Sequence, residues 1–443
     1  MFKARKLPQH LKPSGWLAML PPRPEAPPLE GEVSADVTII GGGFAGLAAA
    51  RRLAQLDPAL RIVLLEALAI GEGACGRNSG FIIDLPHEVS SESYGSDSAT
   101  KARNEITMNR TAIALARGMA EEQGWGREIF DPCGKYAIAM GADGDRHLAE
   151  YARQLQGLGE AHKLLNAAGI QAVTGSPAFT SGLFTPGCIM IQPAAYVRAF
   201  ADALRPTVKL HERTPALSFE RQPSGWCITT PKGKVNSGKI ILANNGHAES
   251  FGFFPGQLLH IFTFASLSAP LDPARLGGQR NWAATPAHPM GTSLRRVQGQ
   301  EQEGDRILVR SRYTYQPDLE VSDATIASAG RLHDAKFKAR FPMLQGLEMQ
   351  YRWGGAMALT WNAVPAFGEI EPGLFAAIAC NGVGATKATA SGIAAAEQVL
   401  GHKSALTAIF EAMEKPKPLP PQPFTALGVK ASLAWRHWRA GAE

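Results

Sequence analysis

The sequence is poor in cysteine, and its few cysteines form no recognisable pattern. They are Cys75, Cys133, Cys188, Cys227 and Cys380, with no C-x-x-C or C-x-x-H spacing among them. This scatter argues against a zinc site and against a disulfide framework, and it is typical of proteins from a reducing compartment. We therefore expect a cytoplasmic protein without a metal site.

The sequence also lacks a long hydrophobic run. The most apolar run covers residues 37–50 and stops at Arg51 and Arg52, which makes it too short to span a bilayer. No continuous apolar segment precedes Pro21 and Pro22, so no secretory signal is predicted. We expect no transmembrane segment.

The central part of the chain lacks an excess of positive charge. The net charge is +6, but residues 1–12 and 415–443 together hold nine basic residues and one acidic residue. The remainder of the chain therefore carries a net charge of −2. A nucleic-acid-binding surface needs a basic patch, so no nucleic-acid partner is expected.

A chain of 443 residues is expected to fold into two lobes. Within it, residues 36–66 predict a nucleotide-binding unit. An apolar strand over 36–40 leads into the spacing G-x-G-x-x-G at Gly41, Gly43 and Gly46, followed by a helical pattern, a second strand and Glu66. Such glycines permit a tight turn, a close approach to a pyrophosphate and close helix packing. Glu66 would accept hydrogen bonds from ribose hydroxyls and repel a 2′-phosphate. The unit therefore favours FAD or NAD over NADP.

Two further glycine-rich turns predict more contacts with a cofactor. Residues 71–80 hold Arg77, Asn78 and Ser79 among four glycines, a composition suited to cradling a phosphate or a ring. An apolar strand over 374–380 then leads into a glycine turn at 382–384 and an alanine-rich helix over 385–400. The N-terminus of this helix would face a second electron-rich group.

Alternating polar and apolar residues over 258–271 and 306–315 predict a second, mostly antiparallel sheet. Strict alternation along 306–315 would put Arg310 and Arg312 on one face and Tyr313 and Tyr315 on the other. Only one of these faces can line a cavity, so all four residues are candidates for binding a substrate.

With both glycine motifs in place, the chain resembles the FAD-dependent D-amino-acid oxidase superfamily, in particular the branch of glycine oxidase, sarcosine oxidase and γ-glutamylputrescine oxidoreductase. The resemblance rests on residues 36–53 with Glu66, GRNSGF at 76–81, ILANNG at 241–246, RWGG at 352–355 and CNGVGATKATASG at 380–392. It implies an α/β protein with a Rossmann-like FAD-binding domain and a second α+β substrate domain that contains a mixed, largely antiparallel sheet.

The expected domain limits follow from this resemblance. After an extended lead-in over residues 1–35, the FAD-binding domain would combine residues 36–95, 145–250 and 342–414. The substrate domain would combine residues 96–144 and 251–341. A proline-rich linker and a basic, aromatic tail occupy residues 415–443. This tail could cover a groove, dock on a partner or make a peripheral contact with an anionic membrane, and docking on its own chain is the favoured interpretation.

The resemblance also implies which residues contact FAD. The first motif would hold the pyrophosphate and ribose, the backbone of Ala216 or Leu217 would reach the adenine, and residues 76–80 and 382–387 would hold the flavin. The expected cofactor contacts are Gly41, Gly43, Phe44, Ala45, Gly46, Glu66, Ala67, Arg77, Asn78, Ser79, Gly80, Ala216, Leu217, Gly246, Gly382, Val383, Gly384, Ala385, Thr386 and Lys387.

Two departures from the family pattern narrow these expectations. Relatives often carry a histidine where this chain has Val383, so a histidine-based role at that position is excluded. Sarcosine oxidases attach the flavin to a cysteine in the region that matches residues 352–365, where this chain has no cysteine. FAD is therefore expected to be noncovalent, with Cys75 as the one exception to consider.

The implied function is oxidation of the C–N bond of an amine or an (N-alkyl) amino acid by hydride transfer to flavin N5, which gives an imine that hydrolyses. Lys387, the catalytic candidate, would add positive charge beside the N1–C2 carbonyl edge of the flavin. An inward arginine would bind a carboxylate or phosphonate and make the substrate an acidic amine. An FAD-dependent 2-hydroxy-acid oxidoreductase and a noncatalytic flavin-binding assembly protein remain alternatives. The electron acceptor stays open between oxygen and a quinone or protein partner.

Overall fold

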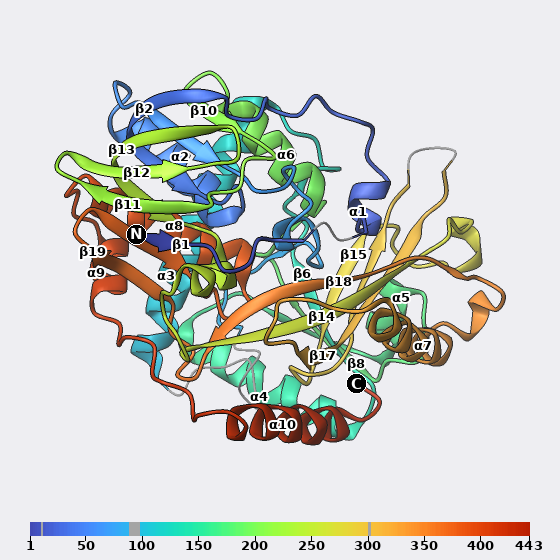
Figure 1. The fold of residues 1–443 in the computed structure, drawn as a ribbon. Helices are drawn as coiled ribbons and strands as arrows, with labels where there is room; N and C mark the ends of the chain where they lie inside the picture. Colours follow the sequence, from blue (N-terminus) through green and yellow to red (C-terminus); the bar gives the residue numbers. More distant parts are fainter. Residues whose placement is uncertain (10–11, 88–97, 300–302) are drawn as a thin grey trace.

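The computed structural model describes residues 1–9, 12–87, 98–299 and 303–443. Two large sheets lie side by side, one at the upper left of Figure 1 and the other across its lower right. A third, small sheet consists of β4 (Phe81–Ile82), β9 (Ile189–Ile191) and β5 (Phe130–Asp131).

Five parallel strands form the centre of the first sheet. Their order is β20 (Leu374–Ile378), β13 (Gly233–Leu242), β2 (Gly31–Ile40), β3 (Ile62–Leu65) and β10 (Val208–His211). All four residues of β3 are apolar and buried, as expected for a parallel strand that is covered on both faces. The sheet is extended by antiparallel pairing of β19 (Ala366–Glu371), β12 (Gly225–Thr229), β11 (Ser218–Gln222) and β1 (Phe2–Lys3).

Helices cover one face of the first sheet. Side chains of α2 and α8 pack with the sheet, α3 and α6 in a single apolar cluster that includes Leu47, Leu53 and Ile393. The helices are α2 (Phe44–Leu56), α3 (Ala99–Gln123), α6 (Pro193–Leu204), α8 (Thr389–Val399) and α9 (Ala405–Glu411). A second apolar cluster, with Phe219 and Trp226 from β11 and β12, covers the other face.

The second sheet is mostly antiparallel, and among the described residues only β15 and β6 pair in parallel. Its order is β18 (Met349–Thr360), β14 (Leu258–Ser268), β17 (Arg306–Tyr315), β16 (Ser293–Val297), β15 (Trp282–Pro286), β6 (Lys135–Ala139), β8 (Ser181–Thr185) and β7 (Lys163–Asn166). The helices around it are α4 (Ala142–Leu158), α5 (Ala167–Thr174), α7 (Asp323–Arg340) and α10 (Phe424–Ala440). A parallel-centred sheet beside a mixed, largely antiparallel one agrees with the predicted fold class.

Strand pairing divides the chain differently from the expected domain limits. β7, β8 and β18 belong to the second sheet, although residues 145–250 and 342–414 were assigned to the FAD-binding domain. Conversely, α3 lies in a segment assigned to the substrate domain but packs in the cluster of the first sheet. The reason is that β18 pairs with β14 along its whole length, and such a distant partner leaves no mark in the local sequence.

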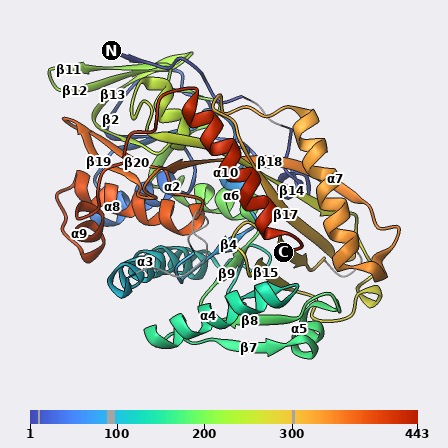
Figure 2. The same ribbon diagram turned by 90° about the horizontal axis from the view of Figure 1, so that it is seen from below.

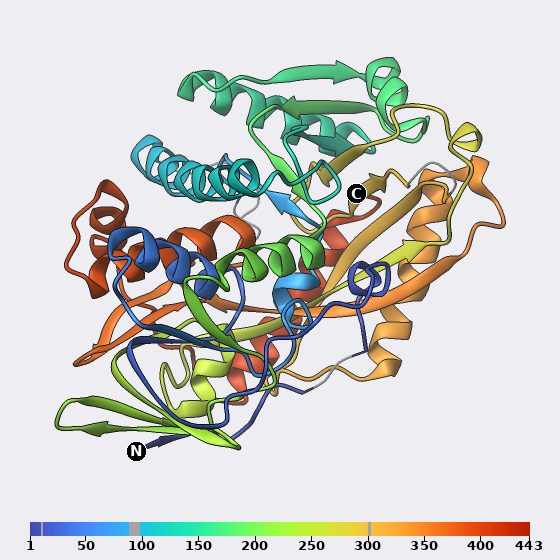
Figure 3. The same ribbon diagram turned by 90° about the horizontal axis from the view of Figure 1, so that it is seen from above.

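The N-terminal segment crosses from the first sheet to the second and returns, as its dark blue trace shows in Figure 3. Its short helix α1 (Gly15–Ala18) buries Trp16 completely against Trp353, with ring centroids 6.2 Å apart. The Trp16 indole Nε1 donates to the carbonyl of Asn78 at 2.7 Å. The proline-rich lead-in is therefore an ordered part of the fold.

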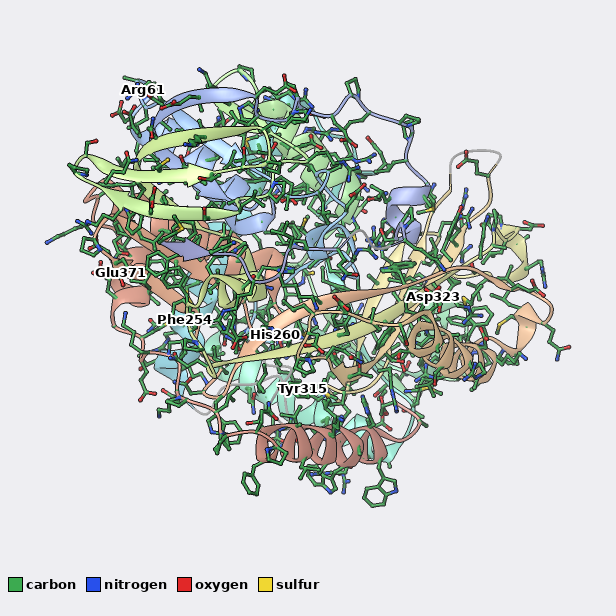
Figure 4. The ribbon with its side chains drawn as sticks, in the orientation of Figure 1. Arg61, Phe254, His260, Tyr315, Asp323 and Glu371 are labelled. Atoms are coloured by element: carbon green, nitrogen blue, oxygen red, sulfur yellow. The ribbon has the colours of Figure 1, made fainter. Side chains whose placement is uncertain are left out.

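The C-terminal helix α10 lies across the second sheet, over β14, β17 and β18 when the molecule is seen from below (Figure 2). Tyr315, labelled in Figure 4, lies between this sheet and α10, and its hydroxyl accepts a hydrogen bond from Gln422 Nε2 at 3.1 Å. In the described part of the chain, no helix combines the length and the apolar character that crossing a membrane requires.

Candidate active site

A cavity of about 350 Å³ opens at the carboxyl ends of the central parallel strands. Ile40, Leu65, Ala243 and Ile378, which end or directly follow β2, β3, β13 and β20, all line it. In open α/β sheets ligands bind at this edge. The opposite wall comes from the second sheet, through residues that include Thr263, Ala265 and Arg310. The cavity therefore has one wall from each sheet.

The turn between β2 and α2 is closed so tightly that only glycine fits at two positions. Gly41 has φ +114°, and an added Cβ would lie 2.7 Å from the carbonyl oxygen of Ala243. At Gly46, an added Cβ would lie 1.8 Å from the carbonyl oxygen of Gly41. No side chain caps the N-terminus of α2, so its first N–H groups remain available for an anion. Gly41, Gly43, Phe44 and Ala45 line the cavity, whereas Gly46 lies behind the turn.

Glu66 lies directly after β3 and lines the same end of the cavity with Ala67. Its Oε2 accepts from the N–H of Gly42 at 2.7 Å, and its Oε1 accepts from the N–H of Leu68 at 2.9 Å. Burial raises the pKa of Glu66 despite these two hydrogen bonds. Each carboxylate oxygen accepts more than one bond, so ribose hydroxyls can also bind here.

Of the two residues predicted to reach the adenine, the structure brings only Ala216 to the cavity. Leu217 uses its N–H to donate to Thr229 and its carbonyl to accept from Ala4, both at 2.8 Å. Its backbone groups therefore belong to the pairing of β11 with its neighbours.

The hydrogen bonds of residues 77–80 mainly fix the conformation of the loop that contains them and its position against neighbouring segments. Arg77 is buried and donates to the carbonyl oxygens of Glu72, Lys12 and Gly354, which holds the loop to the N-terminal segment and to β18. Asn78 donates to the carbonyl of Cys75 at 2.6 Å and accepts from the N–H of Gly80 at 2.8 Å. Arg77, Asn78 and Ser79 line the cavity, but Gly80 does not.

The second glycine turn reaches the cavity from β20. Gly382, Val383, Gly384 and Ala385 line it, and the helical segment that starts at Gly384 directs the positive end of its dipole there. Lys387 also lines the cavity and forms an ion pair with Glu105 on α3. Thr386 is fully buried away from the cavity. Gly246, from the motif at 241–246, lines the cavity as well.

The predicted alternation along β17 is wrong at Arg312. A bulge inserts this residue, because Thr263 pairs with Tyr313 while the next residue, Phe264, pairs with Ser311. Arg312 has φ +65° and is exposed. A bulge adds one residue, so the strand changes face beyond it. Arg310 and Tyr313 consequently meet, whereas strict alternation had put them on opposite faces.

Arg310 is the only one of the four substrate candidates that lines the cavity. Its Nη1 donates to the Tyr313 hydroxyl at 2.5 Å, and its guanidinium carbon lies 4.7 Å from the centre of the Tyr313 ring. Within the described ranges of the chain, Arg310 forms no ion pair with a carboxylate. Tyr313 and Tyr315 are buried between the sheet and α10 and do not line the cavity.

Sequence reasoning missed a polar group of residues beside Arg310. His87, Thr285 and Ser293 line this end of the cavity, and Lys135 is buried behind it with its Nζ 3.4 Å from Thr285 Oγ1. Burial lowers the pKa of His87 well below its ordinary value, and the nearby charges of Lys135, Arg310 and Lys387 lower it further. His87 is therefore neutral near pH 7. A lysine inside the apolar strand at 135–139 was the one signal that could have pointed here.

The residues present fit FAD. The glycine turn, the uncapped end of α2 and Glu66 form a cradle for a pyrophosphate and a ribose at one end of the cavity. The second glycine turn and the side chains of Ala265 and Met357 line an apolar space at the other end. This donor set and this shape suit a dinucleotide whose planar ring lies between the two sheets.

Comparisons with known proteins agree with this fit. A family model described as FAD dependent oxidoreductase matches residues 36–398. The chain is similar to the probable oxidoreductase OrdL of Haemophilus influenzae, at 25% identity over 413 residues that cover 88% of each chain. It is also similar to the gamma-glutamylputrescine oxidoreductase of Escherichia coli, at 24% identity over 432 residues that cover 90% of this chain and 92% of the relative.

A solved structure supports the same fold. The glycine oxidase from Geobacillus kaustophilus matches with a TM-score of 0.68 and 20% identity, covering 84% of this chain and 96% of that chain. The family model spans most of the sequence, including both glycine motifs, and the predicted resemblance is confirmed. The chain therefore belongs to the family of FAD-dependent oxidoreductases known as DAO.

Proposed function

We propose that this oxidoreductase oxidises the C–N bond of an amino acid or N-alkyl amino acid and that Arg310 binds the carboxylate of this substrate. The observation that carries the proposal is the position of Arg310 in the cavity wall, where no carboxylate of the described residues pairs with it. Arg310 is half-buried, and a ligand that covered its guanidinium without pairing with it would leave a buried, unpaired charge, so this wall favours an anionic ligand. A guanidinium matches the two oxygens of a carboxylate.

Tyr313 supports this role by holding the guanidinium in place. The hydroxyl accepts from Nη1, and the ring lies under the guanidinium, so the remaining N–H groups of Arg310 stay available. A preorganised guanidinium loses little side-chain entropy when a substrate binds. Ser293 pairs with Arg310 across β16 and β17 and adds a hydroxyl to the same wall.

FAD would be held by Gly41, Gly43 and Glu66 at its adenosine end and by residues 382–385 at its flavin end. A bound flavin supplies a two-electron acceptor. The start of the helical segment at Gly384 and the charge of Lys387 would stabilise negative charge at that end of the cavity. Because Lys387 is paired with Glu105, its contribution is smaller than that of a free cation.

Apolar side chains would exclude water from the reacting bond. Ala265 of β14 and Met357 of β18 line the wall that carries Arg310, whereas the rings of Phe262 and Phe264 pack toward α7 on the other face of the sheet. Neutral His87, near Arg310, adds no charge that would repel a substrate ammonium. With the carboxylate fixed on Arg310, the C–H bond beside the nitrogen would be directed away from the second sheet, toward the wall formed by residues 382–385.

The names of the similar proteins favour an amine over a hydroxy acid. One relative is a gamma-glutamylputrescine oxidoreductase, and the matching solved structure is a glycine oxidase. Arg310 alone would accept a 2-hydroxy acid equally well, because both substrate classes carry a carboxylate. The choice between them must therefore come from a measurement that varies the nitrogen and the carboxylate separately.

The test is anaerobic bleaching of the bound flavin by matched compounds. Glycine and sarcosine would be compared with methylamine and dimethylamine, which lack the carboxylate, and with glycolate, which lacks the nitrogen; larger amino acids would extend the panel. Reduction by amino acids only is the expected result. Reduction by hydroxy acids alone would establish the alternative activity, and reduction by amines irrespective of a carboxylate would remove the role of Arg310.

We also expect FAD to be noncovalent. Of the described cysteines, Cys75 and Cys380 line the cavity. Burial raises the pKa of Cys75 to about 12 and also raises the pKa of Cys380, so both thiols are protonated and poorly nucleophilic. Acid precipitation should leave all the yellow colour in the supernatant, and Cys75→Ser should retain FAD like the wild type. Colour in the pellet that Cys75→Ser abolishes would demonstrate a covalent bond.

A further inference from the structure

The C-terminal helix α10 carries two apolar faces, and only one of them packs on the protein. On the inner face, Ala426, Val429, Leu433 and Ala440 join a cluster with Ile261, Tyr313 and Met357 of the second sheet. On the other side of the helix lie Phe424, Leu427, Trp435 and Trp438, which are 66%, 62%, 49% and 78% exposed. Figure 4 shows large side chains that project from α10 away from the body.

These four residues form one continuous surface with no charged residue inside it. At 100° per residue they fall on the same side as Gly428, Ala431 and Ala434, which are also exposed. We call this surface, made of the seven residues just named, the outer face of α10. Half of the eight exposed large hydrophobic side chains of the described chain gather here, and such a gathering marks an interaction site.

The charges that flank the outer face are all positive. Lys430 borders one side of the outer face, Arg439 borders the other, and no aspartate or glutamate occurs from 424 to 440. The Arg439 guanidinium lies 5.0 Å from the ring centre of Trp435. A helix with tryptophans on an apolar face and cations on its flanks is suited to lie in the interface of an anionic membrane.

A second copy of the chain fits this face poorly. Two α10 helices packed through their outer faces would bring basic residues of one copy near those of the other, and the helix contains no aspartate or glutamate that could form an ion pair between the copies. Like charges across a helix pair are destabilising. Anionic lipid headgroups, in contrast, would be attracted to the positive flanks of the outer face.

The helix is fixed to the body at both ends, so it can hold the protein in one orientation. Near its start, Gln422 donates to the Tyr315 hydroxyl, and near its end, the N–H of Tyr313 donates to His437 Nε2 at 3.1 Å. Beyond the helix, the Glu443 side chain accepts from the N–H of Met140 at 2.8 Å, and its backbone carbonyl accepts from Lys336 Nζ at 2.9 Å. The outer face is therefore presented rigidly beside the strand that carries Arg310.

We propose that α10 is a membrane-docking helix that lays its outer face into the interface of an anionic lipid bilayer. Docking is peripheral, and it places the face of the second sheet that α10 covers toward the membrane. This goes beyond the proposed oxidation and does not depend on the identity of the amine.

The test is sedimentation of the FAD-bound protein with vesicles. The wild type should sediment with vesicles of phosphatidylglycerol and phosphatidylcholine, and binding should weaken at high salt and on pure phosphatidylcholine vesicles. The double variant Trp435→Ser/Trp438→Ser should bind at least tenfold more weakly. Trp361→Ser is the matched control, since Trp361 is 60% exposed elsewhere on the surface and its loss should leave binding unchanged.

Folding and self-association are measured on the same samples. Flavin absorbance and melting temperature report whether each variant is folded, and Phe424→Ser/Leu427→Ser repeats the test from the other end of the helix. Vesicle binding that survives both double variants would overturn the proposal. The proposal would also be overturned if the wild-type protein did not bind vesicles but was a dimer by light scattering, and if the double variants were monomeric.

Discussion

Arg310→Met is expected to lower kcat/KM for an amino acid substrate by roughly 10²- to 10³-fold. Removing one partner of a buried, hydrogen-bonded charge pair costs about 2–5 kcal/mol, and each 1.4 kcal/mol is about tenfold. Arg310 lines the cavity and forms no ion pair among the described residues, so the substrate carboxylate would be its partner. Most of the loss should appear in KM, because the carboxylate keeps its charge during the reaction and is bound equally in the ground state and the transition state. Steady-state kinetics with the best amino acid of the panel measure both constants.

Arg312→Met provides the matched control for this prediction. Arg312 lies two residues away on the same strand, but the bulge turns it to the exterior, where it is exposed. The substitution removes the same charge and leaves the cavity wall intact, so kcat/KM should change by less than about twofold. Equal losses in both variants would mean that net charge, and not a bound carboxylate, controls the rate. Any residual, slow reduction of the flavin by an amine without a carboxylate should be unchanged in Arg310→Met.

The parts of the site that sequence alone could predict are those set by a few neighbouring residues. The turn at Gly41–Gly46 is predictable because close contacts within a single strand–turn–helix unit require glycine at these positions. Glu66 follows from the same unit, because it ends the strand beside the turn. Gly46 has no room for a methyl group, as the predicted close packing requires, whereas Glu66, predicted to bind ribose hydroxyls, accepts from the N–H of Gly42.

The parts that depend on partners far along the chain were not predictable. The bulge at Arg312 places an arginine at positive φ without a glycine or asparagine to signal it, and it arises opposite Thr263 and Phe264 on another strand. The placement of β18 in the second sheet depends on pairing with β14, which lies about 90 residues earlier. Lys135 and His87 come together with Arg310 only through the folded sheet. Local periodicity carries no information on any of these contacts.

Gly46 lies in the first turn of helix α2, directly against the turn that begins at Gly41. In Gly46→Ala, the new methyl group would lie 1.8 Å from the carbonyl oxygen of Gly41. This oxygen belongs to the backbone and cannot rotate out of the way as a side chain could. Helix α2 must move away from the turn, and the turn then loses the shape that brings Gly41 and Gly43 to the pyrophosphate. Overpacking a core costs about 1–3 kcal/mol in favourable cases. We expect the affinity for FAD to fall at least about 100-fold, measured by titrating FAD into the apoprotein and following its fluorescence.

Gly118→Ala is the control that separates steric exclusion from a general effect of alanine in a helix. Gly118 lies inside α3, and an added Cβ there would meet no atom within 4 Å. Because alanine is favoured over glycine in a helix by about 1 kcal/mol, this variant should melt at the wild-type temperature or slightly above it and should bind FAD normally. Circular dichroism of the Gly46→Ala apoprotein shows whether it is folded before FAD is added. If Gly46→Ala is folded and binds FAD as tightly as Gly118→Ala does, the tight turn at Gly41 does not hold the cofactor. The pyrophosphate would then have to bind elsewhere along the cavity.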